Sequence, residues 1–148
     1  MKFSTSIEYA IHGLAYLARF PADRSVLVSN VAKAIRVPET YLRKVFLQLS
    51  RGGILTSQRG ARGGFRLSRP AEQINLKHVV EVVDGSLPVY SCLSVVRDCR
   101  LQSPCPVHKV FEEARLKMAE VLESTSIKDL VGDITQRRPS ASWLKVTA

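Results

Sequence analysis

The chain has 148 residues, and its 45% hydrophobic and 24% charged side chains are typical of a globular domain rather than a disordered chain. No apolar run approaches the ~18 residues that a membrane span requires, and the first residues lack the apolar block of a secretory signal. We therefore expect a cytoplasmic protein. Three cysteines are an odd number confined to one stretch, which argues against a secreted disulfide scaffold.

The net charge of +9 lies entirely in the first half of the chain. Residues 1–70 contain 12 Lys and Arg against 3 Asp and Glu, whereas residues 71–148 contain 10 of each kind. A one-sided excess of this size predicts an anionic partner for the first half. Nucleic acid is the leading candidate, ahead of an anionic lipid surface.

Apolar spacing predicts three helices in the first fifty residues. Residues 6–20 and 28–35 carry apolar side chains at helical intervals, and residues 38–51 do the same. Pro38 suits the first position of the third helix, because its missing N–H would have no intrahelical partner there. A pair of glycines after residue 51 ends that helix.

A glycine-rich hairpin and a fourth helix are expected next. Two short β-prone runs, residues 54–58 and 65–68, flank the tip Arg59-Gly60-Ala61-Arg62-Gly63-Gly64. Asn75 can cap a further helix that ends at Gly85.

The second half is predicted to hold a long helix after a cysteine-containing loop at residues 86–106. At 1.5 Å per residue, the segment 107–123 would form a helix of about 25 Å. One or two more turns would cover residues 126–131, and the tail from Gly132 is expected to be loosely ordered. The apolar seam of the long helix consists of Val107, Val110, Phe111, Ala114, Met118, Val121 and Leu122.

This order of elements predicts a winged helix-turn-helix: a mainly α fold with a small β-hairpin wing, followed by a long C-terminal helix. A helix fits the major groove of B-DNA, and arginines on a slim tip suit a narrow minor groove. The alternative is a solvated basic face without a DNA partner, which the confinement of charge to this half disfavours. The expected DNA contacts are Thr40, Tyr41, Arg43, Lys44, Gln48, Arg51, Arg59, Arg62 and Gly63.

A cysteine pattern in the second half indicates a metal centre. Cys92, Cys99 and Cys105 are spaced C-x6-C-x5-C, and His108 follows the third cysteine. Three thiolates and an imidazole can fill four positions on zinc or on an iron–sulfur cluster. The wide spacing favours a cluster over a zinc ribbon. Reduced unbound thiols, a redox-sensing pair and a structural role for His108 are the alternatives.

The sequence resembles the bacterial iron–sulfur winged-helix repressors, which include the IscR, NsrR and RirA types. One departure is Arg43, where the family often has Glu. The arginine–glycine wing followed by a three-cysteine loop is the most specific part of the match. The resemblance is carried by residues 6–17, 41–42, 49–55, 59–67, 79–85 and 126–130 and by the three cysteines.

The resemblance implies a homodimer on a palindromic double-stranded DNA operator, paired through the long helix. It also implies a [2Fe-2S] or [4Fe-4S] cluster held by Cys92, Cys99 and Cys105. The fourth ligand would be His108, as in the cluster-biogenesis type, or Glu8 from the first helix of the other subunit, as in the nitric-oxide-sensing type.

We therefore predict a transcriptional repressor whose operator affinity depends on a cluster sensing redox state, nitric oxide or iron. A thiol- or zinc-based sensor on the same scaffold is the alternative. An enzyme with a small-molecule substrate is not expected, because the sequence shows no nucleophile elbow, phosphate loop or zinc-hydrolase signature. Residues 1–70 would bind DNA, residues 71–131 would hold the cluster and the dimerisation helix, and residues 132–148 would be the tail.

Overall fold

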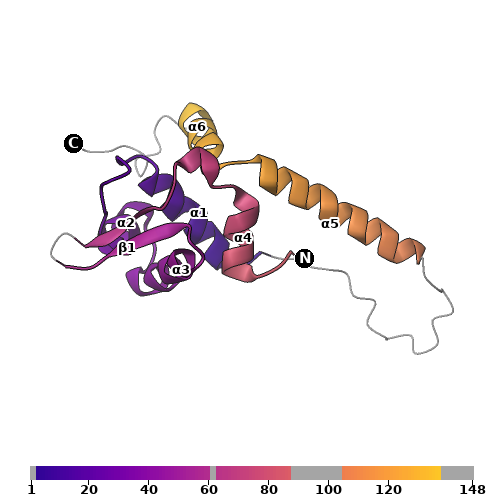
Figure 1. Cartoon of the computed structure of the whole chain (residues 1–148), viewed down its shortest axis with the longest axis horizontal. Helices are drawn as coiled ribbons and strands as arrows, with labels where there is room; N and C mark the ends of the chain where they lie inside the picture. Colours follow the sequence, from indigo (N-terminus) through magenta and orange to yellow (C-terminus); the bar gives the residue numbers. More distant parts are fainter. Residues whose placement is uncertain (1–2, 61–62, 88–104, 138–148) are drawn as a thin grey trace.

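The computed structural model describes residues 3–60, 63–87 and 105–137, and Figure 1 shows their arrangement. The mainly helical fold with an antiparallel hairpin confirms the predicted winged-helix class. Within these residues no helix has the length and apolar character needed to cross a bilayer. The elements are α1 (Thr5–Leu17), α2 (Val28–Ile35), α3 (Glu39–Arg51), β1 (Leu55–Gln58), β2 (Gly64–Leu67), the 3-10 helix η1 (Ala71–Gln73), α4 (Leu76–Asp84), α5 (Pro106–Ser124) and α6 (Ile127–Arg137).

Helix α1 is the centre of the fold and contacts α2, α3, α4 and α6. It packs tightly on α3, where a Cβ on Gly13 would lie 2.6 Å from a ring carbon of Phe46. Any side chain at Gly13 would therefore push the two helices apart. This contact turns one face of α3 inward, and the buried residues of that face are Leu42, Val45, Phe46 and Leu49.

The hairpin is anchored to the core by an isolated β-bridge to a third segment of the chain, which the sequence pattern did not predict. β1 and β2 pair with Leu55 opposite Leu67, and Val26 bridges to Phe65 through two backbone hydrogen bonds of 2.9 Å. The ring of Phe65 packs on that of Phe46, with 5.2 Å between the centroids. The wing is therefore fixed at its root to the same core that positions α3.

Two predicted helix boundaries shift. α1 ends at Leu17 rather than at residue 20, because the chain turns over residues 18–20 ahead of Pro21. Pro38 lies just before α3 rather than inside it, since its backbone is extended at φ −61° and ψ 125°. The expected cap of α4 is confirmed: the side chain of Asn75 accepts a hydrogen bond of 2.9 Å from the backbone N–H of His78.

Helix α6 is longer than predicted and is docked on the core. Its first residue, Ile127, is fully buried, and its N–H donates to the carbonyl of Ile74 at 2.9 Å. The N–H of Leu76 donates to the carbonyl of Thr125 at 3.0 Å. These two bonds tie the junction between α5 and α6 to the start of α4.

The Ile127→Ala variant is expected to lose about 2–5 kcal/mol of unfolding free energy, because truncating a fully buried isoleucine leaves a cavity. Urea unfolding followed by circular dichroism measures this loss. The control is Lys128→Ala at the next, exposed position. A loss below about 1 kcal/mol would show that α6 is not a structural part of the core.

Candidate DNA interface and candidate metal centre

The outward face of α3 presents most of the predicted DNA contacts together. Its inner face is held in the core, so the opposite side chains are exposed to solvent. A helix that exposes hydrogen-bond donors along one face has the chemistry needed to contact bases and phosphates. The predicted residues exposed on α3 are Thr40, Tyr41, Arg43, Lys44, Gln48 and Arg51.

Tyr41 is held at the edge of this face rather than being free to reach outward. Its hydroxyl lies 2.9 Å from Oγ of Ser6, and its ring meets that of Tyr9 edge-on, with 5.4 Å between centroids. Both partners belong to α1. Tyr41 therefore fixes the start of α3 against α1 while its ring remains 42% exposed.

Arg43 carries an ion pair within α3 that the sequence analysis did not consider. Its guanidinium donates to the carboxylate of Glu39 at 2.6 Å, one helical turn earlier. Both side chains are about half exposed, so the pair adds at most a few tenths of a kcal/mol to stability. Its larger effect is electrostatic, because the carboxylate of Glu39 places a negative charge beside the Arg43 donor on the exposed face of α3.

The Glu39→Gln variant is expected to raise affinity for duplex DNA a few-fold at low salt, because it removes that charge and releases Arg43. Fluorescence anisotropy at two salt concentrations measures the change. Glu113→Gln is a matched control, since Glu113 pairs with Lys117 in the same i,i+4 geometry on α5. If the two variants change the DNA affinity equally, Glu39 does not lie near bound DNA.

The wing tip is a glycine-dependent turn. Gly60 has φ +102°, and the N–H of Gly63 donates to the carbonyl of Gly60 at 2.8 Å. Gly63 is buried, and a Cβ on it would lie 2.7 Å from the carbonyl oxygens of Gln58 and Gly60. In the structure Gly63 therefore closes the turn. Arg59, another predicted DNA contact on the tip, is exposed. Arg62 lies outside the described residues.

The start of α5 holds two of the predicted metal ligands. Cys105 is half-buried at the N-cap, and His108 is exposed in the first turn. Residues three apart on a helix lie on the same face, so Cys105 and His108 lie on one side of the first turn of α5. Cys92 and Cys99 lie outside the described residues.

Glu8 is not near this pair within one chain. It is exposed on α1, and in the described ranges no three His, Cys, Asp or Glu side chains gather in a way that could hold a metal ion. Figure 1 shows why: α5 extends away from the rest of the fold, and its N-terminal end, which Cys105 caps, lies far from α1. The guanidinium of Arg115 and, more weakly, the charge of His108 lower the pKa of Glu112 on this helix.

The apolar seam predicted for α5 is divided between two environments. Ala119 is buried against Ile7, Val80 and Leu87, with Met118 and Leu122 beside it. Val110 and Val121 face outward instead, with exposures of 65% and 63%. The burial of Ala119 was not predicted, because its position in the heptad pattern gives no signal of the contact with α4.

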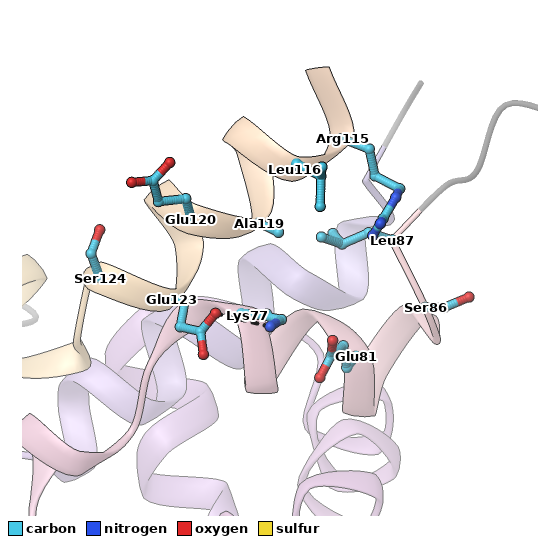
Figure 2. Close-up of a pocket in the computed structure, with 10 residues that line it drawn as sticks. All are labelled: Lys77, Glu81, Ser86, Leu87, Arg115, Leu116, Ala119, Glu120, Glu123 and Ser124. Carbon is cyan, nitrogen blue, oxygen red and sulfur yellow. Dashed lines mark hydrogen bonds and ion pairs between the residues drawn. The ribbon is translucent and has the colours of Figure 1, made fainter. Parts of the chain in front are cut away.

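A cavity of about 620 Å³ lies between α4 and α5, and Figure 2 shows the residues around it. Leu87, Leu116 and Ala119 form its apolar part. Nζ of Lys77 lies 2.9 Å from Oε2 of Glu123, joining the two helices across one side. The remaining charged residues of the lining are Glu81, Arg115 and Glu120, and this mixture of signs is not typical of a site for one small charged ligand.

Fold and surface together define a winged-helix protein with a cationic helix and wing. The chain belongs to the Rrf2 family, described as iron-dependent transcriptional regulators, which matches residues 3–133. This confirms the family resemblance seen in the sequence.

The relatives and solved neighbours are regulators as well. NsrR of Shouchella clausii, a helix-turn-helix transcriptional regulator, is 31% identical over 132 residues, 88% of this chain and 89% of the relative. CymR, the global cysteine regulator of B. subtilis, is 26% identical with a TM-score of 0.73, over 90% of this chain and 98% of its own. IscR of T. potens is 25% identical with a TM-score of 0.72, over 93% and 91%. This chain is therefore a transcriptional regulator of the Rrf2 family.

Proposed function

We propose that this protein is a homodimeric repressor whose affinity for palindromic operator DNA is set by an iron–sulfur cluster. The observation that carries the DNA part is the exposed cationic face of α3, held rigidly by α1 and flanked by the wing. The cluster part is supported by the match to a family described as iron-dependent transcriptional regulators and by the likeness to NsrR and IscR.

The donor set fits an iron–sulfur cluster. Cys92, Cys99 and Cys105 supply three soft thiolate ligands, the type that such clusters prefer. Cys105 makes no side-chain capping bond at the start of α5, so its sulfur is available to a ligand. When bound, the cluster would supply a covalent cross-link between the cysteine loop and α5.

The chain's own contacts provide a route from Cys105 to α3. α5 begins directly after Cys105 and ends at Ser124, and the junction beyond it is bonded to Ile74 and Leu76. α6 then packs on α1, the helix that positions α3. A coupling free energy of about 1–3 kcal/mol along this route would change operator affinity about 5–150-fold.

The outward apolar residues of α5 support a dimer. Val110, Leu116 and Val121 are each more than half exposed on a helix that extends from the fold. A second copy covering them would set two α3 helices side by side, and a separation of ~34 Å would match successive turns of the major groove. The mixed charges around the cavity between α4 and α5 suit a self-complementary interface.

The fourth cluster ligand is proposed to be His108 or Glu8. His108 follows Cys105 on the same helical turn, whereas Glu8 would have to come from the second subunit. If His108→Ala bleaches the protein and Glu8→Ala does not, the ligand is local. The reverse result makes it intersubunit.

The test is to isolate the full chain without oxygen, measure its spectrum and its iron and sulfide content, and titrate duplex DNA before and after iron chelation. We expect a coloured protein whose DNA affinity changes at least about fivefold on chelation. Identical affinity in the two states would reject cluster control, and no salt-dependent DNA binding would reject the DNA interface.

The second candidate is a thiol-based sensor, favoured by the structural likeness to CymR, a cysteine regulator. It predicts a colourless protein after anaerobic reconstitution with iron and sulfide. DNA affinity would then respond to oxidant and be restored by dithiothreitol without iron.

A further inference from the structure

A second cavity lies beside α6, and the proposed function does not use it. It encloses about 250 Å³ between the end of α1, the turn after α1, β2 and the start of α6. Figure 1 shows α6 and α3 on opposite sides of α1. DNA bound on α3 would therefore not fill the space next to α6.

The floor of this cavity is apolar and well fixed. Leu17 is 3% exposed and belongs to the central core, and Phe20 and Leu67 pack against the same core. Pro21 and Pro70 add two rigid side chains at the edges. Because these residues are held by the core, the cavity is a preformed feature of the fold and suits an apolar ligand surface.

The rim is strongly cationic. Arg24, Arg66, Arg69 and Lys128 line it together with one carboxylate, Glu72, so four positive charges meet one negative charge. Glu72 faces Lys128, with 3.9 Å between Oε1 and Nζ. The three arginines come from three different segments, and in the part of the chain that the structure describes none of them forms an ion pair.

Each arginine is oriented by one weak contact and keeps further donors. Arg66 donates to the carbonyl of Ala22 at 3.2 Å, and Arg69 donates to the carbonyl of Gly53 at 3.3 Å. The guanidinium of Arg24 lies over the Phe20 ring, 5.0 Å from its centroid. A guanidinium has five N–H donors in a fixed fork that matches a carboxylate or phosphate, so most of these donors remain available.

We propose that this cavity binds a small organic anion, with a compact apolar body on the floor and a carboxylate or phosphate head held by the arginines. The volume of about 250 Å³ lies below the ~300–1,000 Å³ of pockets for drug-sized ligands, so the ligand is expected to be small. A bound anion would connect β2, which is a strand of the wing, to α6. Helix α6 follows the segment that carries the cysteines. The site thus gives this regulator a small-molecule input separate from its cysteines.

The test uses the full-length protein, isolated without oxygen, with benzoate and phenyl phosphate as probes at constant ionic strength. Calorimetric titration and thermal unfolding are expected to show saturable binding of at least one anion, and an unfolding temperature that rises with its concentration. The better of the two probes identifies the head group. Benzamide, which is neutral, and inorganic phosphate, which lacks the apolar body, are expected to bind much more weakly.

Two variants connect binding to the rim. Arg24→Gln and Arg69→Gln are each expected to lower the affinity for the probe about tenfold, which corresponds to the loss of one charge-assisted hydrogen bond. Arg24 is exposed, so its replacement leaves the fold intact. Lys33→Gln removes the same charge from an exposed position on α2 and is expected to leave the affinity unchanged.

Several results would overturn the proposal. They are the absence of saturable binding, equal binding of benzamide, or full affinity in both arginine variants. Displacement of the probe by duplex DNA, with Arg24→Gln weakening DNA as strongly as changes on α3, would assign the arginines to the DNA surface instead. Anion binding is measured without DNA and is compared before and after iron chelation, so failure of the proposed function would leave this result unaffected.

Discussion

Replacing Cys105 by alanine is expected to remove nearly all bound iron and sulfide from the anaerobically isolated protein. Loss of a group that only supports a metal ligand weakens binding 10–100-fold, and loss of a ligand is expected to exceed that. The change should leave the helices intact, because Cys105 is half-buried and its side chain caps nothing. Visible absorption, iron and sulfide content and helical circular dichroism are the measurements.

Lys109→Ala is the matched control for the cysteine variant. Lys109 is exposed in the same first turn of α5, and only its backbone N–H is bonded to the carbonyl of Cys105. It is expected to keep its full iron content. A Cys105→Ala protein that retains its cluster would remove this residue from the ligand set. Equal losses in both variants would indicate a disturbed helix terminus.

Local signals in the sequence were sufficient for most of the secondary structure in the first half of the chain. Residues 28–35 form α2 as predicted, the Asn75 cap is present, and the apolar face of α3 is buried as its spacing required. The bridge from Val26 to Phe65 was missed because a single rung of sheet has no period of its own. Pairing of this kind depends on segments about forty residues apart, and short-range patterns do not encode it.

The length of α6 was underestimated for a related reason. A polar stretch such as Thr135-Gln136-Arg137 gives little helical signal, and the tail was expected to be loosely ordered from Gly132. In the structure Ile127 is fixed in the core and Asp129 accepts hydrogen bonds from the N–H and hydroxyl of Ser126. Tertiary docking and a capping interaction therefore nucleate a helix that extends to Arg137.

This cap also gives α6 a pH dependence. The hydrogen bonds from Ser126 lower the pKa of Asp129 below its ordinary value. A carboxyl whose pKa falls on folding stabilises the folded state above its unfolded pKa, and that contribution is lost as the pH drops through the folded value. The start of α6 is therefore expected to loosen only in strong acid, well below the range in which DNA binding is measured.

On α3 the sequence predicted which residues are exposed better than it predicted their side-chain contacts. The helical spacing placed Lys44, Gln48 and Arg51 outward, as observed. The i,i+4 spacing of Glu39 and Arg43 is compatible with their ion pair, but it could not show that Tyr41 is bonded to α1 or that Gly63 is buried. The last two depend on contacts outside α3, which the spacing within one helix does not determine.

The Lys44→Ala variant is expected to lose more DNA affinity than a single change at Arg43 on the same helix. Lys44 is exposed on the outward face and, in the described ranges, it has no ion-pair partner, whereas Arg43 is partly neutralised by Glu39. A contact to a base edge contributes about 1–3 kcal/mol of discrimination, so each half-site is expected to lose about 5–150-fold in affinity. A contact to phosphate alone would weaken all duplexes uniformly.

The measurement is a salt titration of binding to a duplex selected from a random pool by the full-length protein. If Lys44 contacts a phosphate as well as a base edge, each lost phosphate contact lowers the slope of log affinity against log salt by about 0.9, so a dimer of Lys44→Ala should lose roughly two units. Lys117→Ala, which removes an exposed lysine on α5, is expected to change neither affinity nor slope. If both variants behave alike, or if neither differs from the parent protein, α3 does not lie against DNA, and the basic first half must contact its anionic partner through another surface.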